Sequence, residues 1–259
     1  MIEKHYHLRG QRVVARQNDT LDPGRRTLVL LHGAGCNHHF FDAVIPHLNG
    51  VNVIVPAFPG RCGSAGEPLD RVVDMAEWVG ELLELLALPA VILGGHSMGG
   101  GVAIEYALPA TKKVAIEALI LLGTGGRLRA RPEVLRAMRN AVKEGAIADV
   151  GRFAYHRSTP EELVDAAEGE RNKTPSETSL ADWFASNGFD RLDAVSGIDR
   201  PTLIVAGRDD IFTPLDYSEY LHAHIAASEL HILDNAGHMF PVERGAEVAG
   251  WIAGFLRKT

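Results

Sequence analysis

The sequence predicts an α/β protein in which a doubly wound, mostly parallel sheet of eight strands carries an all-helical insertion. Short continuous apolar runs recur along the chain, amphipathic stretches separate most of them, and one long section holds helical stretches alone. Such runs are typical of strands buried on both faces, and their alternation with helices is typical of βαβ units. A length of 259 residues is compatible with one large domain of this kind.

The strands begin with a hairpin and continue as buried runs. Alternating segments at His5–Arg9 and Gln11–Arg16 flank Gly10, which favours a β-hairpin. The six later strands are predicted by apolar runs at Thr27–Leu31, Val51–Val55, Ala90–Leu93, Ile116–Leu122, Thr202–Ala206 and Leu230–Leu233.

Apolar residues at helical spacing predict helices between and after these strands. The first covers Val72–Leu86, with Asp70 as its N-cap and Pro89 as its stop. A second covers Val102–Ala107, and the last runs from about Val242 to Leu256. Because parallel strands place their carboxyl ends at one edge of the sheet, ligands are expected to bind there.

One section breaks the alternation of strands and helices. It begins at the end of a strand, so we expect a cap or lid above the sheet rather than an independent domain. The prediction is a core made of residues 1–123 and 199–259 and a cap made of residues 124–198. The helical stretches of the cap are Pro132–Lys143, Pro160–Glu168 and Ser176–Ser186.

Composition argues against several classes of protein. A net charge of −7 disfavours a nucleic-acid surface, and the short basic stretch Arg127–Arg131 is better read as a solvated loop leading into a helix. No apolar run reaches the roughly 18–20 residues that span a bilayer, and the N-terminus lacks a secretory signal. Two cysteines cannot build a disulfide framework. We therefore expect a cytoplasmic protein with no nucleic-acid or membrane partner, either a monomer or a weak homo-oligomer.

The stretch Gly95-His96-Ser97-Met98-Gly99 matches G-x-S-x-G, directly after a predicted strand and before a predicted helix. This is the context of a nucleophile elbow, a strained turn that presents a serine hydroxyl. The alternative is a glycine-rich turn that binds phosphate or only packs. Neither G-x-G-x-x-G spacing nor a Gly-Lys-Ser/Thr ending is present, so phosphate binding is weakly supported.

A serine nucleophile needs a base and an orienting carboxylate. Asp209 and Asp210 follow the Thr202–Ala206 strand, and His238 follows the Leu230–Leu233 strand. All three therefore lie at strand ends on the same edge as Ser97. Asp234 is the other acidic residue near His238, and we expect it to cap the loop.

These residues carry a resemblance to a known family. The chain resembles the α/β-hydrolase superfamily, and within it the capped esterases, lactonases and C–C hydrolases, over nearly its full length. The resemblance selects Asp210, three positions after its glycine, and gives the triad order Ser-Asp-His. It rests on His32-Gly33, Pro59–Ser64, the Gly95–Gly99 elbow, Gly207-x-x-Asp210 and Gly237-His238.

The resemblance also implies an oxyanion hole. In the family its two donors are the backbone N–H groups of the residue after the nucleophile and of the residue after the His-Gly pair. In this sequence those residues are Met98 and Ala34. Neither this hole nor the triad requires a metal ion or an organic cofactor, so we expect none.

We expect structural roles for the other histidines near the site. His96, inside the elbow, is expected to be buried and hydrogen-bonded, and His32 to fix the oxyanion loop. The pair His38-His39 raises the question of a metal site. Neighbouring histidines are expected to point apart, and no third ligand stands at a telling spacing, so a solvated or packed loop is favoured.

The expected function is hydrolysis of a small or medium carboxylic ester through an acyl-enzyme on Ser97. C–C bond hydrolysis, lactone opening and thioester cleavage use nearly the same triad and stay open, whereas Ser97 argues against dehalogenases and epoxide hydrolases, which use aspartate. A non-catalytic receptor on this fold is the alternative of another class, and the complete triad argues against it. Three aromatic residues are expected either to line the acyl pocket or to form the core of the cap: Trp183, Phe184 and Phe189.

Overall fold

The computed structural model describes residues 1–108, 114–147 and 151–259. Residues 148–150 of the predicted cap therefore lie outside the described residues. Eight strands form one sheet in the order β1-β2-β4-β3-β5-β6-β7-β8. The two antiparallel pairs are β1–β2 and β2–β4, and all other neighbours are parallel. The predicted fold class is confirmed. The strands are β1 (Ile2–Leu8), β2 (Gln11–Gln17), β3 (Thr27–Leu31), β4 (Asn52–Pro56), β5 (Ala90–His96), β6 (Ala115–Leu122), β7 (Thr202–Gly207) and β8 (Ser228–Leu233).

Helices cover both faces of the sheet, because the apolar strands alternate their side chains between two cores. The helices outside the insertion are α1 (Val72–Leu85), α2 (Met98–Ala107), α6 (Leu215–His224), α7 (Phe240–Glu243) and α8 (Gly245–Leu256). Leu31 and Leu121 pack with α1, α2 and α6 on one face, whereas Leu30 and Ile120 pack with α8 on the other. None of the described helices is long and apolar enough to cross a membrane.

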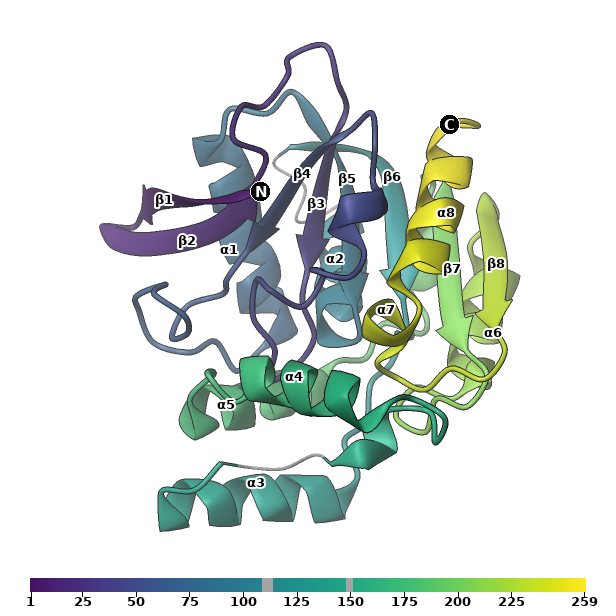
Figure 1. The fold of residues 1–259 in the computed structure, drawn as a ribbon. Coiled ribbons are helices and arrows are strands. Elements are labelled where there is room, and N and C mark those ends of the chain that lie inside the picture. Colours follow the sequence, from purple (N-terminus) through teal and green to yellow (C-terminus); the bar gives the residue numbers. More distant parts are fainter. Residues whose placement is uncertain (109–113, 148–150) are drawn as a thin grey trace.

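The section between β6 and β7 contains helices and no strand among its described residues. Figure 1 shows these helices beyond the carboxyl ends of the strands, where the arrowheads point. They are α3 (Pro132–Glu144), α4 (Glu161–Arg171) and α5 (Ser176–Gly188), with short 3-10 turns at Arg152–Ala154 and Val195–Gly197.

Several local details differ from the predictions. The N-cap of α1 is Arg71, not Asp70, and no side chain caps the helix there. Helix α1 ends at Leu85, before Pro89, because Ala87 already adopts a left-handed backbone with φ 51°. The last predicted helix is two helices, α7 and α8, since Arg244 leaves helical geometry at φ −135° and ψ 39°. Helix α6 is not among the predicted helices, and only its Ser218 and Leu221 are buried.

Candidate active site

Ser97 occupies the single-residue turn between β5 and α2. Its backbone has φ 52° and ψ −116°, a strained conformation for a residue with a side chain. Space explains the flanking glycines: a Cβ on Gly95 would lie 2.1 Å from the Gly99 carbonyl oxygen, and a Cβ on Gly99 would lie 2.2 Å from that of Leu31. The sequence therefore folds into a turn that presents the Ser97 hydroxyl at the carboxyl end of strand β5.

His238 and Asp210 come from the loops after β8 and β7, and the structure brings them together. His238 Nδ1 lies 2.8 Å from Asp210 Oδ2. In this contact the Nδ1–H group of His238 donates to the carboxylate. Nε2 is then the ring nitrogen that carries no proton and can act as an acceptor. Asp209 points elsewhere, with Oδ2 3.9 Å from His156 Nε2. The structure thus brings Asp210 to His238, and not Asp209.

The carboxylate of Asp210 is buried yet well hydrogen-bonded. It accepts the N–H groups of Phe212 at 2.8 Å and Thr213 at 2.9 Å, and the Thr213 hydroxyl at 2.7 Å. Burial alone raises the pKa of Asp210, but the neighbouring His238 and the hydrogen bonds from Thr213 outweigh it, so the net pKa lies below its usual range. Asp210 is therefore ionised at neutral pH and holds the ring of His238.

Ser97 and His238 line one small cavity of about 30 Å³ beside Gly33 and Ala34. Within the described part of the chain, no acceptor pairs with the backbone N–H of Ala34 or of Met98. Such N–H groups, one of them at the start of a helix, can donate to a developing oxyanion. The helical insertion contributes Ala154, Arg171 and Trp183 to the lining of this cavity.

A second, larger cavity adjoins the first. It measures about 260 Å³ and shares Cys36, Arg171 and Met239 with the cavity at Ser97. Its lining comes from α4, from α7 and from residues 36–43, and most of it is apolar. The apolar lining includes Phe40, Ala43, Leu163, Ala167 and Val242.

His96 and His32 are buried neutral rings, as expected. His96 Nε2 lies 2.9 Å from the carbonyl oxygen of His238, and His32 Nδ1 lies 3.0 Å from that of Gly33. Burial lowers the pKa of His96 to about 3 and lowers that of His32 well below its ordinary value. Each ring therefore positions the backbone of a loop at the site without carrying charge.

The depressed pKa of His96 predicts acid sensitivity. In the unfolded chain the ring titrates at an ordinary pKa of 6.5, so below that pH the unfolded state binds more protons than the folded state. His96 therefore lowers the free energy of unfolding as pH falls from 6.5 toward 3. Between pH 7 and 4.5 the expected loss is about 2–3 kcal/mol, measured by urea unfolding. An NMR titration that protonates folded His96 near pH 6 would contradict this.

A fully buried ion pair joins the insertion to the loop that follows β3. Arg61 Nη1 and Nη2 donate to Asp182 Oδ2 and Oδ1 at 2.6 and 2.7 Å, and both side chains are 0% exposed. The same Asp182 on α5 accepts the N–H of Gly35 at 2.8 Å, and Arg61 donates to the carbonyl of Cys36. The pair was not predicted, because its residues lie 121 positions apart.

A second connection holds the loop of His238. Glu243 on α7 accepts the N–H groups of Gly237 at 2.9 Å and of His156 at 2.5 Å. Met239 N–H also donates to the carbonyl of Ala154 at 2.9 Å. Through these bonds and the Asp182–Gly35 bond, the insertion contacts both the loop of His238 and the loop that follows β3.

The three aromatic residues of the insertion have different places. Trp183 lines the cavity at Ser97, whereas Phe189 is buried in the main core and Phe184 is 36% exposed at the surface. Asp234 does not cap its own loop but pairs with Arg208, also at the surface. Burial raises the pKa of Cys62 and raises that of Cys36 to about 12. The thiol nearer the candidate site is that of Cys36, which lines both cavities.

The expectation that His38 and His39 point apart is wrong. Their ring centroids lie 4.5 Å apart, and Glu3 from β1 approaches both rings. The two residues lie in a turn rather than a strand, where neighbouring side chains do not project to opposite faces. No local spacing could have identified Glu3, which is 35 positions away.

Comparisons with known proteins agree on the fold and the family. The sequence profile of the alpha/beta hydrolase family matches residues 28–251. A pimeloyl-[acyl-carrier protein] methyl ester esterase of Neisseria meningitidis is 30% identical over 241 residues, which cover 86% of this chain and 90% of that protein. A 2-hydroxy-6-oxononadienedioate/2-hydroxy-6-oxononatrienedioate hydrolase of Pseudomonas putida is 28% identical over 258 residues, which cover 92% of this chain and 90% of that protein.

Solved structures show the same architecture. The enol-lactonase from Burkholderia xenovorans LB400 superposes with a TM-score of 0.87 at 19% identity, covering 98% of this chain and all of that one. At this identity the likeness shows the fold alone.

Proposed function

The chain belongs to the α/β-hydrolase family, and we propose that it is a serine hydrolase that cleaves a small or medium carboxylic ester through an acyl-enzyme on Ser97. One observation carries the proposal: Ser97, on its strained turn, shares a cavity with His238, whose Nδ1 lies 2.8 Å from the buried Asp210. A serine with that base and that carboxylate is the arrangement of nucleophilic acyl transfer.

The proposed reaction has two halves. His238 Nε2 removes the proton of Ser97 as the hydroxyl attacks the ester carbonyl, and Asp210 stabilises the imidazolium that forms. The backbone N–H groups of Ala34 and Met98 donate to the oxygen that becomes negative. His238 then gives its proton to the leaving alcohol and activates the water that hydrolyses the acyl-enzyme.

The two cavities support a particular way of seating the substrate. About 30 Å³ at Ser97 holds only the reacting group, so the remainder of an ester would extend past Cys36, Arg171 and Met239 into the 260 Å³ cavity. The apolar lining of that larger cavity favours an alkyl chain of medium length.

We also propose that residues 124–198 act as a cap over the reacting group. Trp183 and Arg171 line the same cavity as Ser97, and hydrogen bonds from the insertion reach both catalytic loops. A cap of this kind excludes water from the acyl-enzyme until the alcohol has left.

C–C bond hydrolysis of an acidic substrate is the second candidate. The buried guanidinium of Arg171 lines the cavity at Ser97, although Glu168 already pairs with it at 2.6 Å. The relative named for a hydrolase of 6-oxo dienedioates adds to this candidate. The ester stands first because Glu168 neutralises Arg171 and the adjoining cavity is mostly apolar.

A panel of nitrophenyl esters, lactones, thioesters and a ring-fission diketone separates these reactions, with Ser97→Ala as the blank. The ester proposal expects the highest kcat/KM on nitrophenyl esters of medium acyl length. Turnover of the diketone alone would support the second candidate and overturn the first.

Filling the larger cavity should change chain-length preference. Ala167→Phe is expected to lower kcat/KM on nitrophenyl octanoate by about tenfold or more, because the larger side chain excludes a few methylenes of the octanoyl chain from the cavity. Activity on nitrophenyl acetate should change little. Ala181→Phe on α5, which lines a different surface hollow, is the matched control. Equal losses of kcat/KM on both esters would show that the acyl chain does not occupy this cavity.

A further inference from the structure

We propose that Glu3, His38 and His39 form a binding site for a divalent cation of the zinc class, separate from Ser97. One nitrogen from each histidine and one carboxylate oxygen of Glu3 lie within 4.8 Å of one another. Two imidazoles and a carboxylate are ligands that Zn²⁺ prefers, with a fourth position left for water. The site does not depend on the hydrolase proposal.

The distances fit a tetrahedral ion. Zinc bonds of roughly 2.0–2.1 Å at tetrahedral angles place neighbouring ligand atoms about 3.4 Å apart. Glu3 Oε1 lies 3.0 Å from His38 Nε2 and 3.7 Å from His39 Nε2, on either side of that value. Both distances from Glu3 are therefore within a few tenths of an ångström of the tetrahedral value, and the two ring nitrogens lie within 4.8 Å of each other.

The surroundings of His38 also suit a ligand. The side chain of His38 is 2% exposed and its Nδ1 has no partner among the described residues, so this ring is held in place by packing.

Asp42 supplies the support that metal-bound histidines usually have. Its Oδ2 lies 3.0 Å from His39 Nδ1, so the Nδ1–H of a metal-bound His39 would donate to this carboxylate. Arg16 pairs with the same oxygen at 2.8 Å and also lies 2.6 Å from His39 Nδ1. An N–H of Arg16 at this distance needs an unprotonated Nδ1, whereas a metal-bound His39 carries its proton there, so Arg16 opposes cation binding.

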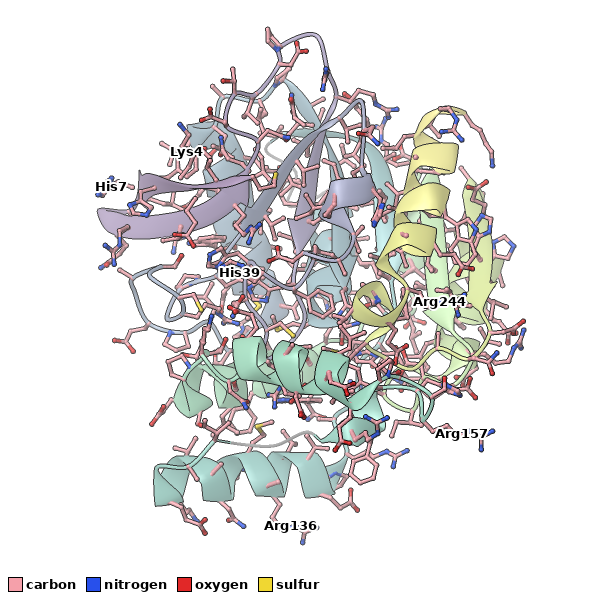
Figure 2. The ribbon with its side chains drawn as sticks, in the orientation of Figure 1. Lys4, His7, His39, Arg136, Arg157 and Arg244 are labelled. Carbon is pink, nitrogen blue, oxygen red and sulfur yellow. The ribbon has the colours of Figure 1, made fainter. Side chains whose placement is uncertain are left out.

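An ion here would join two parts of the chain. Glu3 belongs to the hairpin, whereas both histidines belong to the segment that continues from the oxyanion loop and walls the larger cavity. Figure 2 shows His39 beside the hairpin and His7 near its outer end. A bound cation would therefore cross-link the hairpin to the core and raise the melting temperature.

The experiment titrates Zn²⁺ into the chelator-treated full chain by calorimetry, with the melting temperature recorded in parallel. A Cys62→Ser background removes the half-buried thiol as a competing ligand. We expect one saturable site and a rise in melting temperature. Glu3→Gln and His39→Ala, both at partly exposed positions, should each weaken binding by more than about 100-fold. His7→Ala, on the same hairpin, should bind as the parent does.

Arg16→Gln provides a second test, because it is expected to tighten zinc binding. A general loss of structure would weaken binding and could not produce this result. Absence of saturable heat with an unchanged melting temperature would overturn the proposal and leave an ordinary hydrogen-bonded cluster. Equal affinity in Glu3→Gln, His39→Ala and the parent would also overturn it, since the ion would then bind elsewhere.

Discussion

Ser97→Ala is expected to lower kcat on a nitrophenyl ester by about 10⁴-fold or more while the protein stays folded. The change removes the attacking oxygen, and loss of a triad nucleophile typically leaves only roughly 10³–10⁴-fold rate enhancement over water. Ser97 is partly exposed in its cavity, and its side chain makes no hydrogen bond with the described residues, so stability should change little. The measurement is the initial rate together with the thermal transition.

Ser158 offers a matched control, because it is another serine beside a histidine. Its Oγ lies 2.6 Å from His156 Nδ1, on the exposed surface of the insertion. Ser158→Ala should keep the parent kcat. Retention of parent activity by Ser97→Ala would assign that activity to another residue or to a contaminant.

Asp182→Asn is expected to cost about 3–5 kcal/mol of unfolding free energy, because it leaves the charge of Arg61 buried without its partner. This is a large part of the roughly 5–15 kcal/mol that stabilises a typical domain. Asp182 also holds Gly35, next to the Ala34 N–H of the proposed oxyanion hole. We therefore expect kcat to fall by about tenfold or more with KM nearly unchanged, measured well below the melting temperature.

The control for Asp182→Asn is an ion pair at the surface. Lys258→Met breaks a 2.8 Å contact with Glu229 whose lysine is 64% exposed, and such pairs contribute about 0–1 kcal/mol. Asp182 would be a purely structural residue if Asp182→Asn lowered the melting temperature but left kcat unchanged.

The strands and the clustering of Ser97, Asp210 and His238 were predictable from the sequence because their signals are local. Each buried strand is a short apolar run, and Ser97, Asp210 and His238 each follow a strand within a few residues. The carboxyl ends of parallel strands share one edge, so strand order did not need to be known for these residues to be brought together. The proposed oxyanion donors, Ala34 and Met98, rest on the resemblance to the family.

Contacts between distant segments were not predictable in this way. Asp182 meets Arg61, and Glu3 meets His38, across 121 and 35 positions with no local pattern to link them. The break at Arg244 was also missed: Gly245 is needed there because a Cβ would lie 2.2 Å from the carbonyl oxygen of Ala43. Periodicity reports which face of a helix is apolar, but not which backbone approaches it.

Covalent labelling tests the central claim most directly. The intact protein is mixed with a fluorophosphonate probe, and the adduct is located by mass spectrometry of its peptides. The proposed mechanism predicts one adduct per chain on the Ser97 oxygen, loss of esterase activity in step with labelling, and no labelling in Ser97→Ala. A folded protein that takes no adduct on Ser97 while hydrolysing esters at the parent rate would contradict it.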